Sequence, residues 1–257
     1  MTTRPLLFIA LSAVLYSPRA FAQAAAPADK EPPPLWDLQV GASFVGTSGN
    51  SDTASTGADF TAHRRGEVWK IDATATAVRT TDKDTTTAER YLGSIRGDRA
   101  LNPRVSFSTG EKAEHDRFAG IEYRNILDAG LSWVLVKDTA WTLDGVTSLA
   151  WNHETRTVGD NLNDPVGVFQ LLSRIPFGTA GDTTQRVTFY PDFRTSSAYR
   201  TEAELTAQAA MNSHLALKFV YLLRYSNAPV PGFEKTDNTT TASVVFRWKA
   251  STPAPKP

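Results

Sequence analysis

Histidine, serine and acidic residues are the first side chains in this sequence that could do chemistry. The four histidines are His63, His115, His153 and His214. A lipid hydrolase needs a nucleophile, a histidine and an acid that converge, and Ser148 with His153 and Glu154 is the nearest such set. His153 and Glu154 are neighbours, so in a strand their side chains point to opposite faces, and no Gly-x-Ser-x-Gly elbow occurs. We therefore do not expect an enzyme.

Acidic residues offer little for a metal ion. The run Asp82, Lys83 and Asp84 lacks the ligand density and the glycine of a calcium loop, so we expect a solvated loop tip. The chain has no cysteine, which excludes thiolate metal sites and a disulfide framework. We expect neither a metal nor a cofactor.

Ionisable residues recur at every second position in segments whose other positions are apolar. If these segments cross a membrane as strands, the charges must face a polar lumen, because a lipid-facing charge costs ~2–4 kcal/mol at the midplane. The expected lumen-lining residues are Lys70, Asp72, Arg90, Arg96, Asp98, Lys112, Arg186, Asp192, Arg194, Glu202, Glu204, Lys218, Arg224 and Arg247. Both signs occur, which suits either an ion-paired plug or a narrow polar channel. If the lumen conducts, we expect anions to be favoured, with Glu202 and Glu204 opposing, by Arg90, Arg96, Arg186, Arg194, Lys218 and Arg224.

The elements that would hold these side chains are β-strands. From Leu35 to Lys249 the dominant period is two, as where Leu38, Val40 and Ala42 alternate with Gln39 and Gly41. The segments run roughly 10–13 residues, the length of a tilted membrane-spanning strand. The predicted strands are 35–47, 53–63, 67–79, 87–100, 104–114, 123–136, 139–153, 164–176, 184–195, 200–211, 214–226 and 236–248. The eighth alternates least, so a ten-stranded barrel is the alternative.

The connections and the tryptophans agree with an antiparallel barrel. Every second connection is predicted to be a short periplasmic turn, except 177–183, whereas the opposite loops are longer and polar. Gly49 and Asn50 form the predicted hairpin turn between the first two strands, since both tolerate positive φ. An aromatic belt at the periplasmic rim is predicted from Trp36, Trp69, Trp133, Trp141 and Trp248.

The ends of the chain indicate export. Residues 1–22 have the pattern of a signal peptide, with Arg4, an apolar core from Leu6 and a cleavage site at Ala20-Phe21-Ala22. Residues 23–34 form an Ala/Pro-rich leader, residues 35–249 the barrel, and residues 250–257 a Pro-rich tail. After residue 22 no apolar run reaches the length of a spanning helix. The 27 basic and 27 acidic side chains balance, which argues against a nucleic-acid partner.

These segments resemble one family. The strand from Trp36 to Gly46, the turn 47–53, Trp69, the run 116–118 and the run 235–237 are similar to those of the salt-induced outer-membrane protein family, domain of unknown function 481 (DUF481). The similarity spans residues 36–248. It implies a transmembrane antiparallel β-barrel in the outer membrane and supplies no activity.

Three functions follow from this reading. The first is an outer-membrane barrel that is structural or a narrow channel for ions and small solutes, linked to salt or envelope stress. Its expected partners are outer-membrane lipids and the barrel-assembly machinery; the oligomeric state stays open. The alternatives are a lipid-modifying outer-membrane enzyme and a soluble periplasmic β-sandwich binding module.

Overall fold

The computed structural model of the chain describes residues 35–48, 53–82, 85–178 and 180–250, and almost all of them lie in long strands. The strands are β1 (Trp36–Ser48), β2 (Thr53–Arg65), β3 (Trp69–Asp82), β4 (Thr85–Ala100), β5 (Val105–Asp116), β6 (Ile121–Lys137), β7 (Thr142–Arg156), β8 (Leu162–Phe177), β9 (Gly181–Tyr190), β10 (Arg200–Ala210), β11 (Leu215–Ser226) and β12 (Thr236–Ala250). A short 3-10 helix, η1 (Arg117–Ala119), follows β5. No helix in these ranges is long and apolar enough to span a membrane.

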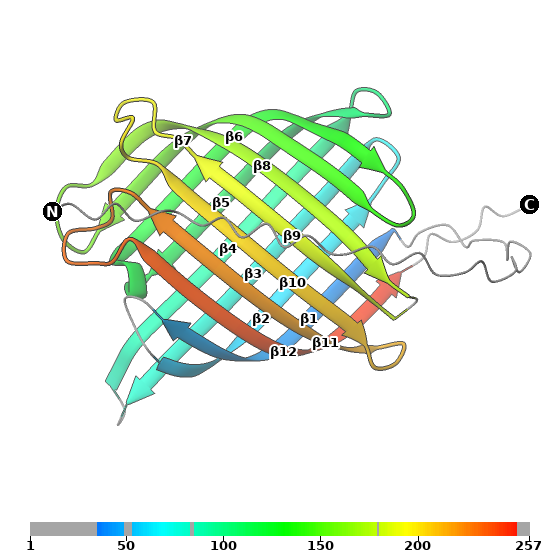
Figure 1. Cartoon of the computed structure of the whole chain (residues 1–257), viewed down its shortest axis with the longest axis horizontal. Helices are drawn as coiled ribbons and strands as arrows, with labels where there is room; N and C mark the ends of the chain where they lie inside the picture. Colours follow the sequence, from blue (N-terminus) through cyan, green and yellow to red (C-terminus); the bar gives the residue numbers. More distant parts are fainter. Residues whose placement is uncertain (1–34, 49–52, 83–84, 179, 251–257) are drawn as a thin grey trace, which may run out of the picture. The chain divides into compact units, whose positions relative to one another are not determined.

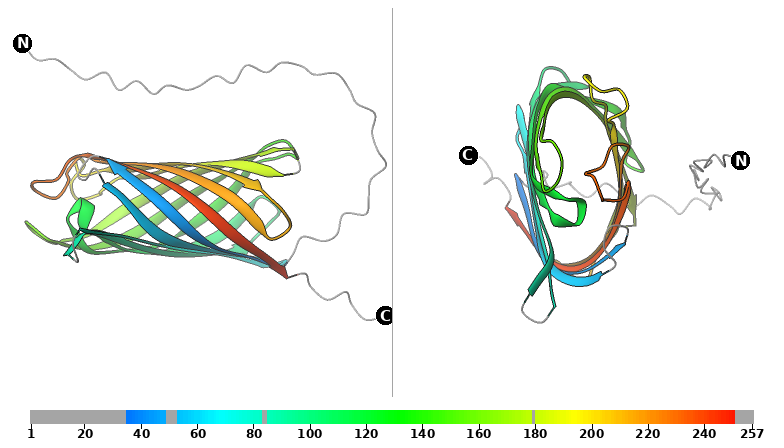
Figure 2. Two further views of the ribbon diagram at one scale, coloured as in Figure 1. Left: turned by 90° about the horizontal axis from the view of Figure 1, so that it is seen from below. Right: turned by 90° about the vertical axis from the view of Figure 1, so that its left-hand side faces the viewer.

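Each strand pairs antiparallel with its neighbours in sequence, and β12 returns to β1 (Figure 1). The closing seam runs without interruption from the pair Trp36 and Ala250 to the pair Ser48 and Asn238. The twelve-stranded barrel predicted from the alternation is therefore confirmed, and the ten-stranded alternative is wrong. The barrel is flattened, with β3–β5 along one long side and β9–β11 along the other (Figure 2).

The period-two pattern separates two faces of the wall. On β1, Val40 and Phe44 point outward and are 56% and 59% exposed, whereas Gln39 and Ser43 point inward and are buried. The same division recurs on the other strands, with large apolar side chains outward and charged or small ones inward. This arrangement places most large apolar side chains on the outer surface, so the interior of the barrel is filled by the side chains that point into the lumen.

The two rims differ in their connections. At the inner rim, where β1 begins and β12 ends, the fully described connections are 66–68, 101–104, 138–141 and 211–214. Three of these turns use one device, in which the side chain of Asn102, Asp138 or Asn212 accepts a hydrogen bond from a backbone N–H two residues on. In the turn at Asp138, the Ala140 N–H lowers the pKa of the carboxyl below its ordinary value. Short turns mark the periplasmic side of outer-membrane barrels.

At the outer rim, the connections 157–161, 191–199 and 227–235 are longer than the inner turns, whereas 117–120 has the same length as three of them. The tryptophans of the predicted belt lie on the outer surface near the inner rim: Trp36 and Trp69 begin their strands, Trp141 precedes β7, and Trp133 and Trp248 lie near strand ends. The sixth, Trp151, lies toward the outer rim. The predicted turn at Gly49 and Asn50 falls outside the described residues, as do the signal peptide, the leader and residues 251–257 of the tail.

The structure places β9 earlier in the chain than the sequence predicted. The expected strand 184–195 is instead Gly181–Tyr190, so the connection to β8 is tight and residues 191–199 form an outer loop. Pro191 follows the last residue of the strand and has no N–H to donate to a ladder. Beyond it, the backbone contacts of the chain with β8 are the bridge between Val166 and Asp192 and two hydrogen bonds at Pro165 and Gly167.

Two glycines provide a test of the register. A Cβ on Gly130 would overlap the Thr147 carbonyl oxygen and the Ser148 Cα, whereas a Cβ on Gly93 meets nothing within 4 Å. We expect Gly130→Ala to lower the unfolding free energy by about 1–3 kcal/mol through overpacking. The matched Gly93→Ala should raise it by about 0.5–1 kcal/mol, because alanine loses less backbone entropy in a strand. Urea titration of the barrel refolded in lipid vesicles measures both, and equal effects would contradict this register.

Candidate functional site

The site begins with three inward side chains of β5. Lys112, Glu114 and Asp116 share one face of the strand, and Ala113 and His115 lie between them on the other face. All three carry charge, so each needs a partner once it leaves water. The partners come from the opposite wall of the barrel.

Two sets of ion pairs cross the lumen. The Lys112 Nζ lies 2.6 Å and 2.7 Å from the two carboxylate oxygens of Glu202 on β10. Arg224 on β11 reaches β5 with two nitrogens, Nη1 at 2.7 Å from Glu114 Oε1 and Nη2 at 2.6 Å from Asp116 Oδ2. In the closed strand order β11 is six strands from β5 in either direction. These contacts therefore join the two long sides of the flattened barrel.

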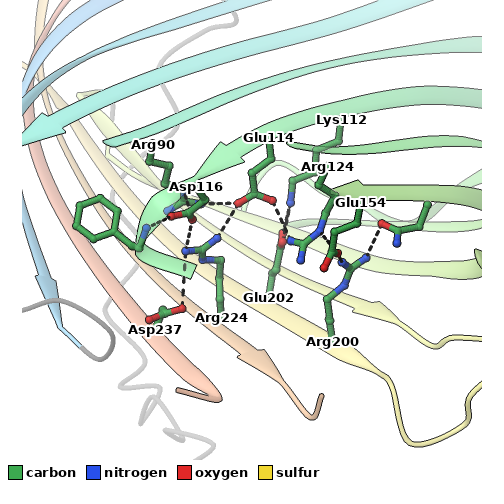
Figure 3. Close-up of polar contacts among 12 residues, drawn as sticks. Arg90, Lys112, Glu114, Asp116, Arg124, Glu154, Arg200, Glu202, Arg224 and Asp237 are labelled. Atoms are coloured by element: carbon green, nitrogen blue, oxygen red, sulfur yellow. Dashed lines mark hydrogen bonds and ion pairs between the residues drawn. The ribbon is translucent and has the colours of Figure 1, made fainter. Parts of the chain in front are cut away.

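A second centre of charge lies on β7. Glu154 accepts a hydrogen bond from Arg124 Nε at 2.7 Å, from Arg156 Nε at 2.6 Å and from Arg200 Nη1 at 3.1 Å. Arg124 also contacts Glu114 at 3.1 Å, which links the two centres. Figure 3 shows the result, a continuous chain of contacts from Asp237 through Arg224 and Glu114 to Arg200. We call these residues, with Arg90, Lys112, Asp116 and Glu202, the transluminal network.

The carboxylates of the transluminal network are withdrawn from water. The side chains of Asp116 and Glu154 are 0% exposed and that of Glu114 is 1% exposed. An isolated charge would not be stable there, and it persists only because several guanidinium groups satisfy it. The network therefore packs buried ion pairs into the outer half of the lumen, and we call this part of the lumen the closure.

Apolar side chains fill the space beside the network. Ile126, Ala150, Val166, Val168 and Tyr190 form a buried cluster on inward positions of β6–β9. The Tyr190 ring lies beneath both Lys112 Nζ and the Arg200 guanidinium, at 5.6 Å and 5.5 Å from its centroid. These are cation–π contacts. Through them Tyr190 joins the apolar cluster and the network into one packed unit.

The outer loops pack over the network. Gly120 has a φ of 71°, and a Cβ there would overlap the ring of Phe233 in the loop 227–235. Val230 of the same loop is buried, and Pro231 lies against Gly159 of a third loop. A cavity of 70 Å³ remains between this loop and the network, lined in part by Arg124, Arg200 and Arg224. Arginine lines a space that is large enough for water and too small for a sugar.

The inner half of the lumen is less filled. Arg186 pairs with Glu204 at 3.3 Å, but their side chains are 39% and 26% exposed. Lys70 near the inner rim is exposed. The lumen therefore passes from a charged vestibule at the inner rim to a closure beneath the outer loops.

The structure brings four of the predicted lumen residues, Arg90, Lys112, Glu202 and Arg224, into the network. Others pair elsewhere on the lumen wall, as Arg96 does with Asp128, Lys218 with Asp59 and Arg247 with Asp37. Asp72 contacts His63, and Asp98 accepts a hydrogen bond from Ser132. None of the cations named as anion-selecting on the lumen wall stands without a carboxylate.

Two predicted lumen residues lie elsewhere because β9 ends early. Arg194 is on the outer loop 191–199, where its side chain is 59% exposed, pairs with Asp164 and lies over the outward-facing Trp151. Its assignment to the lumen wall was wrong. Asp192 is buried in the same loop and accepts hydrogen bonds from the Arg194 and Thr195 amides, so it holds the loop rather than a strand.

Sequence reasoning missed the anions at the centre of the network. Glu114, Asp116 and Glu154 fell at or beyond predicted strand ends, because β5 and β7 continue farther than expected. Arg124 and Arg200 were overlooked, although each shares the phase of other inward residues on its strand. The alternation of inward and outward positions along each strand was enough to identify all five as inward residues. No local pattern indicates which residue of the opposite wall each one contacts.

The residues weighed for catalysis do not converge. Ser148 is buried inside the lumen, whereas His153 is exposed on the outer face of the same strand. His115 points outward and stacks on Tyr91. Across the described ranges, no group of three or more histidine and acidic residues could hold a metal ion.

Comparison with protein families identifies the family of the chain. The family described as "Protein of unknown function, DUF481" matches residues 40–248. The chain belongs to this family. No curated protein matches its sequence.

Solved structures supply the fold of this DUF481 chain. A NanC porin structure superposes with a TM-score of 0.55 at 13% identity, covering 80% of this chain and 98% of that one. The COG4313 outer membrane channel from Pseudomonas putida F1 gives a TM-score of 0.50 at 11% identity, covering 88% and 100%. At these identities the likeness is one of fold, that of small outer-membrane channels.

Removing the anion at the second centre tests the network. Glu154→Ala leaves three guanidinium groups without their shared carboxylate, so we expect a loss of about 3–5 kcal/mol in unfolding free energy. The control Glu204→Ala removes a partly exposed partner and should cost about 1 kcal/mol or less. Urea unfolding in lipid vesicles measures both, and an equal small loss would show that Glu154 is not at a buried centre.

Proposed function

We propose that this chain is an outer-membrane channel for ions and small hydrophilic solutes whose narrow passage is controlled by the transluminal network. The observation that carries the proposal is the pairing of Lys112 with Glu202 and of Arg224 with Glu114 across the lumen. This closure sits above a charged vestibule. The channel-like fold supports the proposal but names no solute.

The chemistry of the closure favours a controlled passage over a permanent plug. Replacing buried ion pairs by apolar side chains of similar volume is often neutral or stabilising. A permanent plug could therefore be apolar throughout, as the cluster around Tyr190 already is. Charged side chains can instead exchange their partners for water and ions, so a network of them can open without exposing apolar surface.

The pairing also bears on selectivity. Since Arg90, Arg96, Arg186, Lys218 and Arg224 each face a carboxylate, we expect an opened lumen to discriminate only weakly between small cations and anions. The expectation of an anion preference rested on the shared inward phase of the cations, with Glu202 and Glu204 opposing them. Reversal potentials in a salt gradient distinguish these outcomes.

The remaining expectations accompany the proposal. We propose that a signal peptide cleaved near Ala22 exports the chain, that the assembly machinery inserts it, and that outer-membrane lipids surround it. The proposal includes no catalytic activity, cofactor or nucleic-acid partner. A purely structural barrel linked to salt or envelope stress is the second candidate, and the dense packing of the outer half favours it.

Planar-bilayer recording separates the two candidates. We expect the wild-type barrel to conduct weakly and Lys112→Ala/Glu202→Ala to conduct several-fold more, because the double variant removes one bridge across the lumen without leaving an unpaired charge. The control Arg186→Ala/Glu204→Ala removes a pair on one wall and should change conductance little.

The shift in gel mobility on boiling confirms that each variant is a closed barrel. If both the wild type and Lys112→Ala/Glu202→Ala fail to conduct, the channel proposal is wrong and the structural role is favoured.

A further inference from the structure

One charged side chain points toward lipid in the middle of a strand. Glu111 lies midway between Val105 and Asp116 on β5 and is exposed on the outward face. The other charged residues that point outward in the described ranges all lie near the ends of their strands. They are Arg64, Arg79, Glu89, Arg99, Glu122 and Lys137. An ionisable residue inside the membrane is expensive and marks a functional surface.

The hydrogen bonding of Glu111 is incomplete. Its carboxylate accepts one hydrogen bond, at 2.7 Å, from the side-chain amide of Asn125 on β6. Neither side chain makes another hydrogen bond or an ion pair among the described residues. The pair therefore presents a carboxylate oxygen, an amide N–H and an amide carbonyl toward lipid, which can satisfy none of them.

A glycine beside the pair has no explanation inside the barrel. Gly93 on β4 pairs in regular register with Ala75 and Ala113, so it marks neither a bulge nor a bend. A Cβ at Gly93 would meet nothing within 4 Å, so the fold of this chain does not require glycine there. Glycine in a strand interior otherwise marks the close approach of another backbone. Together with Ala75 and Ala113, Gly93 forms a part of the outer surface next to Glu111 that carries only small side chains.

We propose that this surface, formed by Ala75, Gly93, Glu111, Ala113 and Asn125 and called the β3–β6 wall, is the interface between two copies of this chain in the membrane. The partner is a second copy because the unsatisfied hydrogen-bonding groups of Glu111 and Asn125 include both acceptors and a donor, and are therefore self-complementary. A two-fold axis along the membrane normal places the pair against its own equivalent, so that each amide N–H meets the other copy's carboxylate. Such an interface is isologous.

The shape of the barrel suits this arrangement. The β3–β6 wall lies mostly on a long side of the flattened barrel (Figure 2), where two copies can meet over a broad area. Small residues let membrane walls approach, and polar side chains at the contact fix the partner. The proposal concerns the outer surface and does not depend on whether the lumen conducts.

Single cysteines provide the test, because the chain has none of its own. Gly93→Cys and Ala113→Cys place a thiol on the β3–β6 wall, and Val187→Cys places one on the outward face of β9 on the other long side. In isolated outer membranes treated with an oxidant or a flexible bis-maleimide, we expect a cross-linked dimer for the first two and several-fold less for Val187→Cys. Heat-dependent gel mobility checks that each variant is a closed barrel.

A second change isolates the carboxylate. Added to Ala113→Cys, Glu111→Leu should reduce the dimer several-fold, whereas Glu111→Gln, which keeps hydrogen-bonding groups, should retain most of it. Cross-linking no stronger than that of Val187→Cys, or a product whose mass is not twice that of the chain, would overturn the dimer. An unchanged dimer with Glu111→Leu would remove Glu111 from the interface.

Discussion

The cost of leaving a charge unpaired in a medium without water governs this structure. Lipid outside the wall forces charged side chains inward, and a lumen with little water forces them to find partners. Twelve strands make an interior wider than side chains from one wall can fill. The flattened barrel meets both demands at once, because its long sides are close enough for Lys112 to reach Glu202 and for Arg224 to reach Glu114.

The strands were predictable because each carries its own evidence. Alternation on β1, where Val40 faces lipid and Gln39 faces the lumen, needs only neighbouring residues to be recognised. Turn chemistry at Asn102, Asp138 and Asn212 is equally local. The twelve-stranded count, the closed topology and the family all followed from features of this kind, and the structure and the family match agree with them.

The contents of the lumen could not be predicted in the same way. Arg224 meets Glu114 across a sequence separation of 110 residues, and its phase says only that it points inward. The end of β9 at Tyr190 was missed because Val187 and Phe189 continue the alternation up to Pro191, and Arg194 was misplaced as a result. Glu111 contradicts the rule that charges face the lumen, although its place beside the inward Lys112 already indicated that it points outward.

The two halves of the lumen suggest how closure and passage coexist. The outer half is held by buried carboxylates beneath the contact of Phe233 with Gly120, and the inner half keeps partly exposed pairs such as Arg186 with Glu204. If the barrel conducts as proposed, a solute entering from the inner rim meets partly exposed charges before it meets the buried charges of the network, and the network is then the step that limits passage.

A double-mutant cycle between Arg224 and Glu114 tests the central claim most directly. The unfolding free energies of the wild type, Arg224→Met, Glu114→Gln and the double variant, measured by urea titration in lipid vesicles, give the coupling between opposite walls. The account predicts a favourable coupling of about 0.5–3 kcal/mol, the range for residues in one network. A coupling of zero within error would show that the two walls are not joined and would contradict it.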